Sequence, residues 1–428
     1  MTHSLEIQPL ARPADATLRP PGSKSITNRG LVCAALATGQ SVLRGALASE
    51  DTQVMIDALG RLGIAIEVLD AGQTLRVAGC GGNLPATAAD LYVANSGTTV
   101  RFLTALVTLG RGTYRLDGTP RMRERPIQDL LDALAQLGVR AHSERPGGCP
   151  PVVIEAGGLP GGRATVRGGV SSQFLSGLLM AAPYAASALE LLIEGPLVSQ
   201  PYIEMTLAVM RSFGVEIETD GLSRFRIAAP RAYRPATFDI EPDASAASYF
   251  WAAAAISGGR VAVEGLSRSS LQGDVAFCEC LAQMGCPVVY GADRVTVVGG
   301  ALRGIDVDMN AISDTVQTLS AVALFADGPT RIRGVSHIRH KETDRIGALA
   351  TELRKLGARV EEHEDGLTIV PGKVRGATID TYNDHRMAMS LSLVGLRVPG
   401  VVINDPGCTA KTYPRFFEDL ARLNPARI

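Results

Sequence analysis

The sequence predicts an α/β protein of two domains, each built from three copies of one small module. The chain has 428 residues, which is too long for one ordinary core and fits two domains of about 200 residues. An amphipathic helix ending in Leu-Gly or a similar pair, followed by strand, turn and strand, recurs every 70 to 76 residues or so. An Ala/Leu-rich helix and a further strand precede each copy, so one module reads helix, strand, helix, strand, strand.

A glycine follows the amphipathic helix in five of the six copies. These glycines are expected to end their helices in the left-handed conformation. The sixth copy stops at FFEDLARLN, before its strand pair, whereas the chain opens with the strand-like segments SLEIQPL and DATLRPPGS. We therefore expect the N-terminal strands to complete the sixth module. The five glycines are Gly63, Gly138, Gly214, Gly285 and Gly357.

This closure places the first residues in the domain that holds the last three modules. The chain then crosses between domains near Gly22 and near the segment EPDAS at 241–245. Domain one is predicted as 22–241, and domain two as 1–21 plus 242–428. Two adjacent crossings form a hinge, and ligands commonly bind between domains joined in this way.

The composition excludes several classes of protein. With 46% hydrophobic and 20% charged residues the chain is typical of a globular protein, and its formal net charge of −1 gives no basic field for nucleic acid or a membrane surface. Without a membrane-spanning stretch or signal peptide, we expect a cytoplasmic location. Seven scattered cysteines without a CxxC pair predict reduced thiols. His337 and His340 have a helical spacing, but no nearby ligand pattern completes a metal site, so no metal is predicted.

The stretch PGSKSITNR gathers anion-binding groups at the start of a predicted helix. Ser25 and its neighbours can cap the helix, but capping needs only one hydroxyl. Lys24 and Arg29 lie near the positive end of the helix, where a cation is unfavourable unless an anion binds. The stretch therefore indicates a local anion site.

Three further clusters in the first half of the chain have similar chemistry. NSGTTVR precedes a helix, and its glycine lets the backbone approach a ligand closely. RMRERP concentrates arginines, although a solvated basic loop explains it equally well. SSQFLSG presents hydroxyls and an amide at a helix start, where capping explains part of the pattern.

The second half of the chain holds HKETDR, NDHRMAM and CTAKTYP. If the first of these is helical, Lys341 and Arg345 share one face at i, i+4, where like charges repel. Each cluster taken singly is also compatible with a solvated surface patch.

In this order, PGSKSITNR, NSGTTVR, DGTPRMRERP, SSQFLSG, HKETDR, NDHRMAM and CTAKTYP closely resemble the 5-enolpyruvylshikimate-3-phosphate synthase family of enolpyruvyl transferases, over nearly the whole chain. The resemblance implies an inside-out α/β barrel of two domains with three βαβαββ modules each. It implies a transferase of the shikimate pathway, in aromatic amino-acid biosynthesis. Such an enzyme joins phosphoenolpyruvate to the 5-hydroxyl of shikimate 3-phosphate through a tetrahedral intermediate and releases phosphate, without a metal or cofactor.

The resemblance also assigns roles to individual residues of this sequence. Asp314 resembles the acceptor of the hydroxyl proton and Glu342 the proton donor to the methylene carbon, with Lys24 and Lys341 assisting. The residues that look like contacts to shikimate 3-phosphate are Lys24, Ser25, Arg29, Ser171, Ser172, Gln173, Ser199, Tyr202, Asp314 and Lys341. Those that look like contacts to phosphoenolpyruvate are Lys24, Asn95, Gly97, Arg125, Gln173, Arg345, His385, Arg386 and Lys411.

Two positions depart from the family pattern. His337 stands where several relatives carry an asparagine that contacts the shikimate phosphate, so it is not assigned to the site. Phe102 stands where many relatives carry proline, in a loop that borders the phosphoenolpyruvate site and so bears on glyphosate, the family's inhibitor. The resemblance further implies a monomer without nucleic-acid or membrane partners.

Two alternatives are weighed against this interpretation. UDP-N-acetylglucosamine enolpyruvyl transferases share the fold but use a loop cysteine; GGCPP around Cys149 falls in a predicted strand-to-strand turn, and RMRERP, in the comparable loop, contains no cysteine. A non-catalytic phosphometabolite-binding protein would need the cations but neither Asp314 nor Glu342, whose charge opposes anion binding. The presence of both carboxylates in the sequence favours an enzyme over a binding protein.

Overall fold

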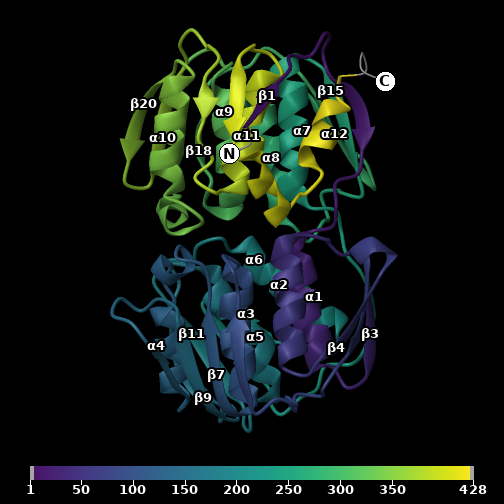
Figure 1. The fold of residues 1–428 in the computed structure, drawn as a ribbon, viewed down its shortest axis with the longest axis vertical. Coiled ribbons are helices and arrows are strands. Elements are labelled where there is room, and N and C mark those ends of the chain that lie inside the picture. The colour runs from purple at the N-terminus through teal and green to yellow at the C-terminus, as the bar shows by residue number, and fades with distance from the viewer. Residues whose placement is uncertain (1–3, 425–428) are drawn as a thin grey trace. The chain divides into compact units, whose positions relative to one another are not determined.

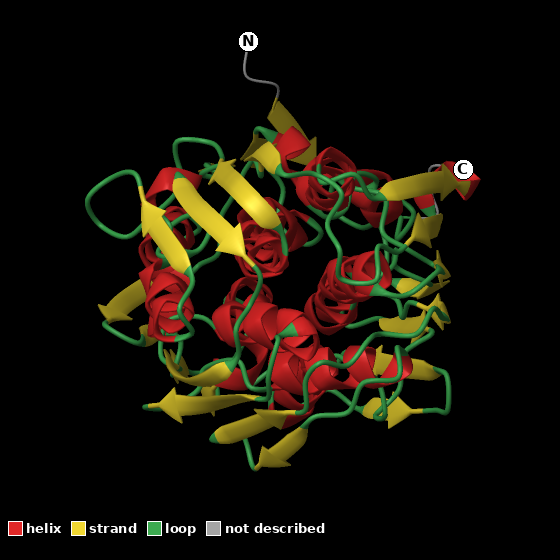
Figure 2. Ribbon diagram, turned by 90° about the horizontal axis from the view of Figure 1, so that it is seen from below, coloured by secondary structure: helices red, strands yellow, loops and turns green. Residues whose placement is uncertain are grey.

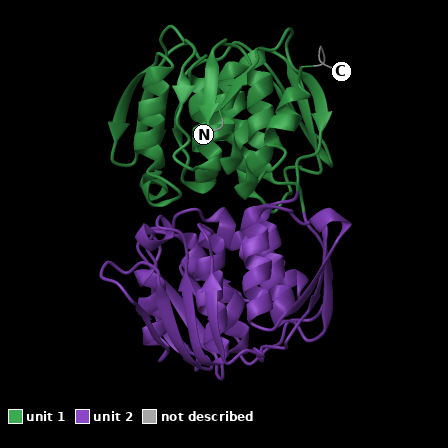
Figure 3. Ribbon diagram, viewed as in Figure 1, with its two compact units in different colours: residues 1–21, 241–428 green, residues 22–240 purple. Residues whose placement is uncertain are grey.

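The chain passes twice between two units. The computed structural model describes residues 4–424. Unit 1 joins the segment that ends at Pro21 to the one that begins at Glu241, and unit 2 runs from Gly22 to Ile240 (Figure 3). The predicted domain two also includes 1–3 and 425–428, which lie outside the described residues.

In the view of Figure 2, helices lie mostly toward the inside and strands mostly toward the outside. In unit 2, three helices are buried along nearly their whole length, because their sequences are apolar or uncharged on almost every side. Three amphipathic helices lie outside them and bury one face each. The buried helices are α1 (Lys24–Leu36), α3 (Gly97–Leu106) and α5 (Ser172–Ala181), and the amphipathic ones are α2 (Glu50–Arg61), α4 (Gln128–Gln136) and α6 (Pro201–Ser212).

Three four-stranded sheets enclose the helices of unit 2. In each sheet, the first two strands in spatial order pair parallel, and the strands that follow pair antiparallel with their neighbours. Their spatial orders are β14 (Thr237–Asp239), β3 (Gln40–Arg44), β5 (Thr74–Ala78), β4 (Ala65–Leu69); β6 (Ala88–Tyr92), β7 (Arg111–Asp117), β9 (Val152–Gly157), β8 (Arg140–Ser143); and β10 (Gly162–Arg167), β11 (Leu189–Glu194), β13 (Arg224–Ile227), β12 (Glu218–Asp220).

Unit 1 repeats this arrangement within its described residues. Its buried helices are α7 (Ala244–Ser257), α9 (Val316–Ala323) and α11 (His385–Gly395), and its outer helices are α8 (Phe277–Gln283), α10 (Arg345–Lys355) and α12 (Phe416–Ala421). Its sheets run β16 (Val288–Tyr290), β17 (Arg294–Val298), β15 (Arg260–Glu264), β2 (Asp15–Leu18); β18 (Asp306–Asp308), β19 (Thr330–Arg333), β21 (Gly366–Val370), β20 (Arg359–His363); and β1 (Ser4–Ile7), β23 (Val401–Asn404), β22 (Thr378–Ile379).

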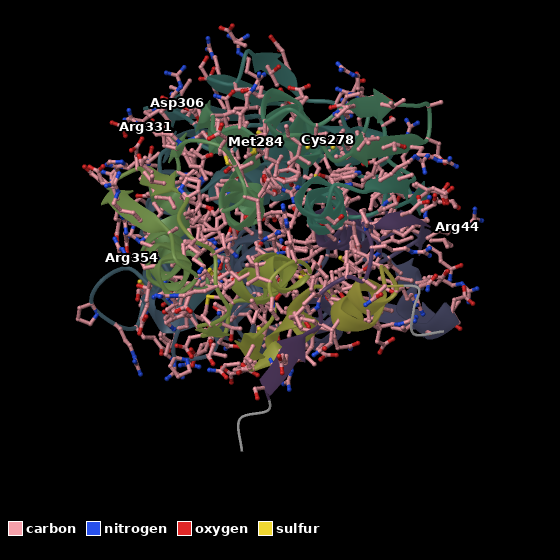
Figure 4. The ribbon with its side chains drawn as sticks, turned by 90° about the horizontal axis from the view of Figure 1, so that it is seen from above. Arg44, Cys278, Met284, Asp306, Arg331 and Arg354 are labelled. Atoms are coloured by element: carbon pink, nitrogen blue, oxygen red, sulfur yellow. The ribbon has the colours of Figure 1, made fainter. Side chains whose placement is uncertain are left out.

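Short 3-10 helices join several of these elements. The parallel strands pair residue by residue in a fixed register. Asp306 and Arg331, for example, are register partners across β18 and β19, and Figure 4 labels both. The 3-10 helices are η1 (Asp70–Gly72), η2 (Val107–Leu109), η3 (Met122–Glu124), η4 (Ala182–Tyr184), η5 (Gly273–Ala276), η6 (Asn310–Thr315), η7 (Ser336–His340) and η8 (Pro406–Lys411).

The two N-terminal strands do not both join the sixth module, and this part of the prediction is wrong. The first strand, β1, pairs antiparallel with β23 and lies among the last elements of the chain (Figure 1). The second, β2, pairs parallel with β15 in the sheet of the fourth module. The reason is that the fourth module begins directly with α7, so β15 has a free edge that the segment before Pro21 fills.

The first module is completed in a corresponding way. The chain enters unit 2 directly into α1, and β14, the last strand before the return at Ile240, supplies the parallel partner of β3. Each segment that leaves a unit is therefore hydrogen-bonded to a strand of that unit before it leaves.

The helix-ending glycines predicted from the repeat are confirmed. Gly63, Gly138, Gly214, Gly285 and Gly357 follow α2, α4, α6, α8 and α10, and all have φ between 79° and 110°. Only glycine adopts this conformation without steric cost, so it stops each helix and turns the chain into the next strand.

None of the described helices is long and apolar enough to cross a membrane. All seven cysteines are free thiols, and four of them are buried.

The contact between α11 and β1 gives a test of the fold. A Cβ atom at Gly395, the last residue of α11, would lie 2.4 Å from the Cβ atom of Ile7. We expect Gly395→Ala to lower the free energy of unfolding by about 1–3 kcal/mol, because the buried contact cannot widen without moving β1.

Gly60 is the matched control, since it is exposed in α2 and a Cβ atom added there would meet no other atom within 4 Å. Gly60→Ala is expected to stabilise by about 0.5–1 kcal/mol. Thermal or urea unfolding of both variants measures the difference, and equal stability for Gly395→Ala and wild type would show that β1 does not pack closely on α11.

Candidate functional site

The three buried helices of unit 2 begin with neutral caps. Ser23, Ser96 and Ser171 are the N-cap residues of α1, α3 and α5, and the hydroxyl oxygen of each accepts a backbone N–H two or three residues further on. No acidic residue stands in the first turn of these helices. The positive ends of the three helix dipoles are therefore not offset by a carboxylate within their own first turns.

Hydrogen bonds bring these three helix starts together. The Asn28 side-chain amide of α1 donates to the Thr98 hydroxyl of α3 over 2.7 Å. The Arg101 guanidinium of α3 donates to the Gln173 Oε1 atom of α5, also over 2.7 Å, and to the Pro126 carbonyl over 3.1 Å. The motifs PGSKSITNR, NSGTTVR, RMRERP and SSQFLSG thus meet in one region of unit 2.

Arg29 is fully buried in this region and is held entirely by uncharged groups. Its guanidinium donates to the Thr206 hydroxyl over 2.7 Å, and to the Ser176 hydroxyl and two backbone carbonyls over 3.0–3.3 Å. The ring centroids of Phe102 and Tyr202 lie 5.1 and 5.9 Å from its central carbon. Burial lowers the pKa of Arg29 to about 10. No carboxylate is among these partners of Arg29 in the described part of the chain. A bound anion would therefore balance the positive charge of this guanidinium.

Two other cations of unit 2 lie at the same helix starts. The Lys24 ammonium is 3.5 Å from the carboxylate of Asp51, which stands in the first turn of α2. Arg125 is buried and donates to the backbone carbonyl and the side-chain oxygen of Asn95 over 2.8 and 3.1 Å. A Cβ atom at Gly97 would lie 2.5 Å from the Arg125 guanidinium, so a larger residue at this position would displace that guanidinium.

The remaining unit 2 residues expected in the site lie around these cations. Ser25 follows Lys24 in α1, and its carbonyl accepts a hydrogen bond from Arg29. Ser172 is the first residue of α5 and is buried. Ser199 has a left-handed φ of 54° just before α6, and the Tyr202 carbonyl also binds Arg29.

In unit 1, three cations converge on Asp314. The Lys341 ammonium donates to its Oδ1 atom over 2.6 Å, and Arg345 donates to the same atom over 3.2 Å. Arg386 donates to its Oδ2 atom over 2.8 Å and to the Tyr249 hydroxyl over 3.3 Å. Both carboxylate oxygens of Asp314 are thus occupied by cationic donors.

Arg345 links this carboxylate to two others. Its Nη2 atom donates to Glu342 over 2.9 Å, and its Nε atom donates to Asp384 over 2.7 Å. The Lys411 ammonium lies 4.0 Å from the other oxygen of Glu342. Four cations and three carboxylates therefore share one network, in which Arg345 and Asp384 are almost completely inaccessible to solvent.

Asp384 and Asp344 decide where two helices of unit 1 begin. Asp384 is the N-cap of α11 and accepts the Arg386 backbone N–H over 2.9 Å. The adjacent His385 is buried, with its Nδ1 atom 3.6 Å from Asp384. Asp344 caps α10 by accepting two backbone N–H groups.

Lys341 and Arg345 do not share a helical face. Because Asp344 caps α10, this helix begins at Arg345, and Lys341 lies before it at the end of η7. Their like charges are accommodated because both donate to Asp314. Burial lowers the pKa of Lys341, and the charge of Asp314 opposes this shift.

The residues expected from the sequence thus fall into two groups. Those from Lys24 to Tyr202 lie together in unit 2, and those from Asp314 to Lys411 lie together in unit 1. Lys24 is the only one of the four expected catalytic residues in unit 2.

Sequence reasoning did not assign several residues of these networks. Asp384 lies inside NDHRMAM, and its position just before an apolar helix is a capping signal that could have identified it. Arg101 is the last residue of NSGTTVR. Asp51 and Tyr249 lie outside the motifs, and no local pattern marks them.

Cys149 lies in the turn between β8 and β9, as predicted, and is not part of either group. RMRERP, the loop in which the alternative transferase is expected to carry a cysteine, contains none.

Known families, curated sequences and solved structures all contain close matches to this chain. The family model described as EPSP synthase (3-phosphoshikimate 1-carboxyvinyltransferase) matches residues 11–420. The 3-phosphoshikimate 1-carboxyvinyltransferase of Nostoc punctiforme is 51% identical over 97% of this chain and 97% of its own length. The protein of the same name from Thiobacillus denitrificans is 50% identical over 96% of this chain and 97% of its own.

Among solved structures, EPSP synthase from Acinetobacter baumannii superimposes with a TM-score of 0.81 at 27% identity, covering 99% of this chain and 98% of that one. The enolpyruvyl transferase NikO from Streptomyces tendae has the same fold, with a TM-score of 0.78 at 22% identity, 99% coverage of this chain and 98% of its own. The ordered motifs, the two threefold units and the full-length match agree, and the chain belongs to the EPSP synthase (3-phosphoshikimate 1-carboxyvinyltransferase) family.

Proposed function

We propose that Asp314 and Glu342 are the two proton carriers of the reaction that this family catalyses. The protein transfers the enolpyruvyl group of phosphoenolpyruvate to the 5-hydroxyl of shikimate 3-phosphate and releases phosphate. One observation carries the assignment: a single buried guanidinium, that of Arg345, holds both carboxylates, with hydrogen bonds of 3.2 Å to Asp314 and 2.9 Å to Glu342. Two carboxylates at fixed positions suit one base and one acid.

In the addition step, the 5-hydroxyl oxygen bonds to C2 of phosphoenolpyruvate. Its proton passes to Asp314, while the methylene carbon takes a proton from Glu342. The product of this step is a tetrahedral C2 that carries both the ether oxygen and the phosphate. Lys24 and Lys341 assist by stabilising the oxygen as its proton leaves.

In the elimination step, the bond between C2 and the phosphate oxygen breaks, and its electron pair leaves with phosphate, which takes up the proton that Asp314 received in the addition step. The methyl carbon returns its proton to Glu342, which restores the double bond of the enolpyruvyl ether. We assign to Arg345, Arg386 and Lys411 the stabilisation of the negative charge on the departing phosphate.

Phosphoenolpyruvate would bring its negative charge to the cations beside Glu342, which are Arg345 at 2.9 Å and Lys411 at 4.0 Å. We assign Asn95, Gly97, Arg125, Gln173 and His385 to the same ligand, together with Lys24, Arg345, Arg386 and Lys411.

We assign shikimate 3-phosphate to the hydroxyl-rich helix starts of unit 2. Arg29 supports this assignment, because it is buried there and, within the described residues, donates hydrogen bonds to uncharged hydroxyl and carbonyl groups. The residues assigned to this substrate are Lys24, Ser25, Arg29, Ser171, Ser172, Gln173, Ser199 and Tyr202, together with Asp314 and Lys341.

His337 takes no part in proton transfer in this proposal. It is buried beside the unit 1 network, and burial, followed by the charge of Lys341, lowers its pKa to about 3. The imidazole therefore stays neutral at physiological pH and adds no positive charge to the site.

We expect the protein to act as a monomer in the cytoplasm without a macromolecular partner. The free state of all seven cysteines supports a reducing compartment. Light scattering in solution measures the oligomeric state.

Replacement of Glu342 tests the catalytic assignment. Glu342→Gln cannot supply the proton to the methylene carbon, so we expect kcat to fall by about 10²–10⁴-fold. Phosphate release is followed with both substrates present. Glu279→Gln, at an exposed position of α8, is the control and should keep wild-type activity. Equal rates for the two variants would remove Glu342 from the mechanism.

Replacement of Arg29 tests the shikimate 3-phosphate assignment. Arg29→Lys retains a charge but cannot reproduce the guanidinium's hydrogen bonds to Thr206, Ser176 and two carbonyls. We expect shikimate 3-phosphate to bind about 10- to 100-fold more weakly, as measured by calorimetry. Arg44→Lys, exposed in β3, should bind it normally. Unchanged affinity in Arg29→Lys would contradict the assignment.

The lowered pKa of His337 predicts a pH-dependent stability. Between about pH 6.5 and pH 3 the unfolded chain binds a proton on this residue that the folded chain does not, so the wild type loses stability as pH falls through this window. His337→Asn lacks this loss. Urea unfolding at pH 7 and pH 4.5 measures the free energy of unfolding. Between these two pH values it should fall by up to about 2–3 kcal/mol more in the wild type than in His337→Asn. If both proteins lose the same stability, His337 titrates normally in the fold.

A further inference from the structure

The outer helix α10 is fastened at two points to the segment that precedes α11. Arg345 and Glu352 are seven residues apart in α10 and therefore lie on one face, two turns apart. Arg345 donates to Asp384 over 2.7 Å, at one end of this segment. Glu352 accepts the Tyr382 hydroxyl over 2.6 Å and the Asp380 backbone N–H over 3.1 Å.

Between these two points the backbone makes a turn that is costly for its residues. Tyr382 and Asn383 both have left-handed conformations, with φ of 54° and 52°. The Asp384 N–H donates to the Thr381 carbonyl over 2.8 Å and closes the turn. Two consecutive non-glycine residues in this region, one of them bulky, cost on the order of 1–3 kcal/mol each unless their surroundings hold them.

The Tyr382 hydroxyl is well placed to hold this turn. Tyr382 as a whole residue is 40% exposed, but its acceptor, Glu352, has no solvent exposure. Glu352 Oε2 binds the Asp380 N–H and the Lys355 ammonium. Within residues 4–424, the Tyr382 hydroxyl is the donor to Oε1. Burial and the adjacent Glu352 raise the pKa of Tyr382, so its hydroxyl stays protonated and remains a donor.

The turn leads directly into groups of the unit 1 network. Asp384 follows Asn383, binds Arg345 through two nitrogen atoms, and caps the helix that begins with His385 and Arg386. A shift of the turn would therefore move the acceptor that orients the Arg345 guanidinium and the backbone that carries Arg386.

We propose that Tyr382 is a positioning residue for phosphoenolpyruvate binding, which acts by tying the 381–384 turn to Glu352 and so fixing Asp384 against Arg345. The inference rests on the assignment of Arg345 and Arg386 to phosphoenolpyruvate proposed above. Tyr382 does not itself touch the substrate in this proposal.

Steady-state kinetics of Tyr382→Phe test the proposal, because this variant keeps the ring and removes only the donor. We expect KM for phosphoenolpyruvate to rise about tenfold, the factor that corresponds to one lost hydrogen bond to a charged group. KM for shikimate 3-phosphate should change less than about twofold, since eight of the ten residues assigned to this substrate lie in unit 2, outside the unit that holds the turn. Tyr92→Phe, at an exposed position of β6, is the matched control and should leave both constants unchanged.

Asn383→Gly separates the effect of the Tyr382–Glu352 hydrogen bond from the effect of the strained backbone at 382–383. This variant relaxes the left-handed backbone but keeps the Tyr382 hydroxyl, so KM for phosphoenolpyruvate should stay near the wild-type value. A rise as large as that in Tyr382→Phe would assign the effect to the turn itself and overturn a role for the hydroxyl.

A double-mutant cycle with Arg345→Gln separates this inference from the proposed function. If Arg345→Gln leaves KM for phosphoenolpyruvate unchanged, the substrate assignment itself is wrong. If Arg345→Gln raises that KM and Tyr382→Phe does not, only the positioning role is wrong. If both raise it, their effects on kcat/KM should be less than additive, since Tyr382 acts through Arg345.

Fully additive effects would overturn the proposal. So would a Tyr382→Phe protein whose thermal unfolding midpoint falls while both KM values stay at wild type, because that result describes a purely structural hydrogen bond.

Discussion

The first turns of buried helices determine the electrostatics of both units. A buried helix start presents N–H groups that need acceptors, and the choice of acceptor sets the local charge. Unit 2 uses the serine hydroxyls of Ser23, Ser96 and Ser171. Unit 1 uses the carboxylates of Asp243 and Asp384, and Asp314 lies just before α9. The same helical framework therefore has a different charge in its two copies.

This difference explains how each unit tolerates its cations. In unit 2, Arg29 is surrounded by hydroxyls, carbonyls and aromatic rings, an environment that leaves its charge available to a ligand. In unit 1, Arg345 is bound by three carboxylates before any ligand arrives. These carboxylates have fixed positions and defined partners, which suits proton transfer, and the four cations of the network outnumber them, which leaves positive charge for an anionic substrate. An uncompensated cation suits recognition of a phosphate.

The crossing segments show a second consequence of the repeated architecture. A module needs a strand before its first helix, but the modules that follow a crossing begin with the helix itself. β2 and β14 supply the missing strands, each from the segment that is about to leave the unit. Both passages between units are therefore anchored by strand pairing, and the segments between the anchors and the helix caps Ser23 and Asp243 are short.

Several features could be predicted from contiguous residues. The repeat, the helix-ending glycines, the two-unit α/β architecture and the motifs of the EPSP synthase family depend on local periodicity, turn chemistry and order along the chain. Gly63 and Gly357 adopt positive φ for reasons contained in their own segments. The residue types of PGSKSITNR and HKETDR likewise indicate anion chemistry without knowledge of their neighbours.

Other features were decided only by the tertiary structure. The sheet that β2 joins depends on an edge more than 240 residues away, and the bond between Arg345 and Asp384 joins residues 39 positions apart. The start of α10 at Arg345, rather than before Lys341, depends on Asp344 as a cap and on the shared acceptor Asp314. A local pattern shows which charged and hydrogen-bonding groups a segment contains. Which distant groups pair with one another is decided by packing, because a buried charged group or strand edge is stable only beside a partner.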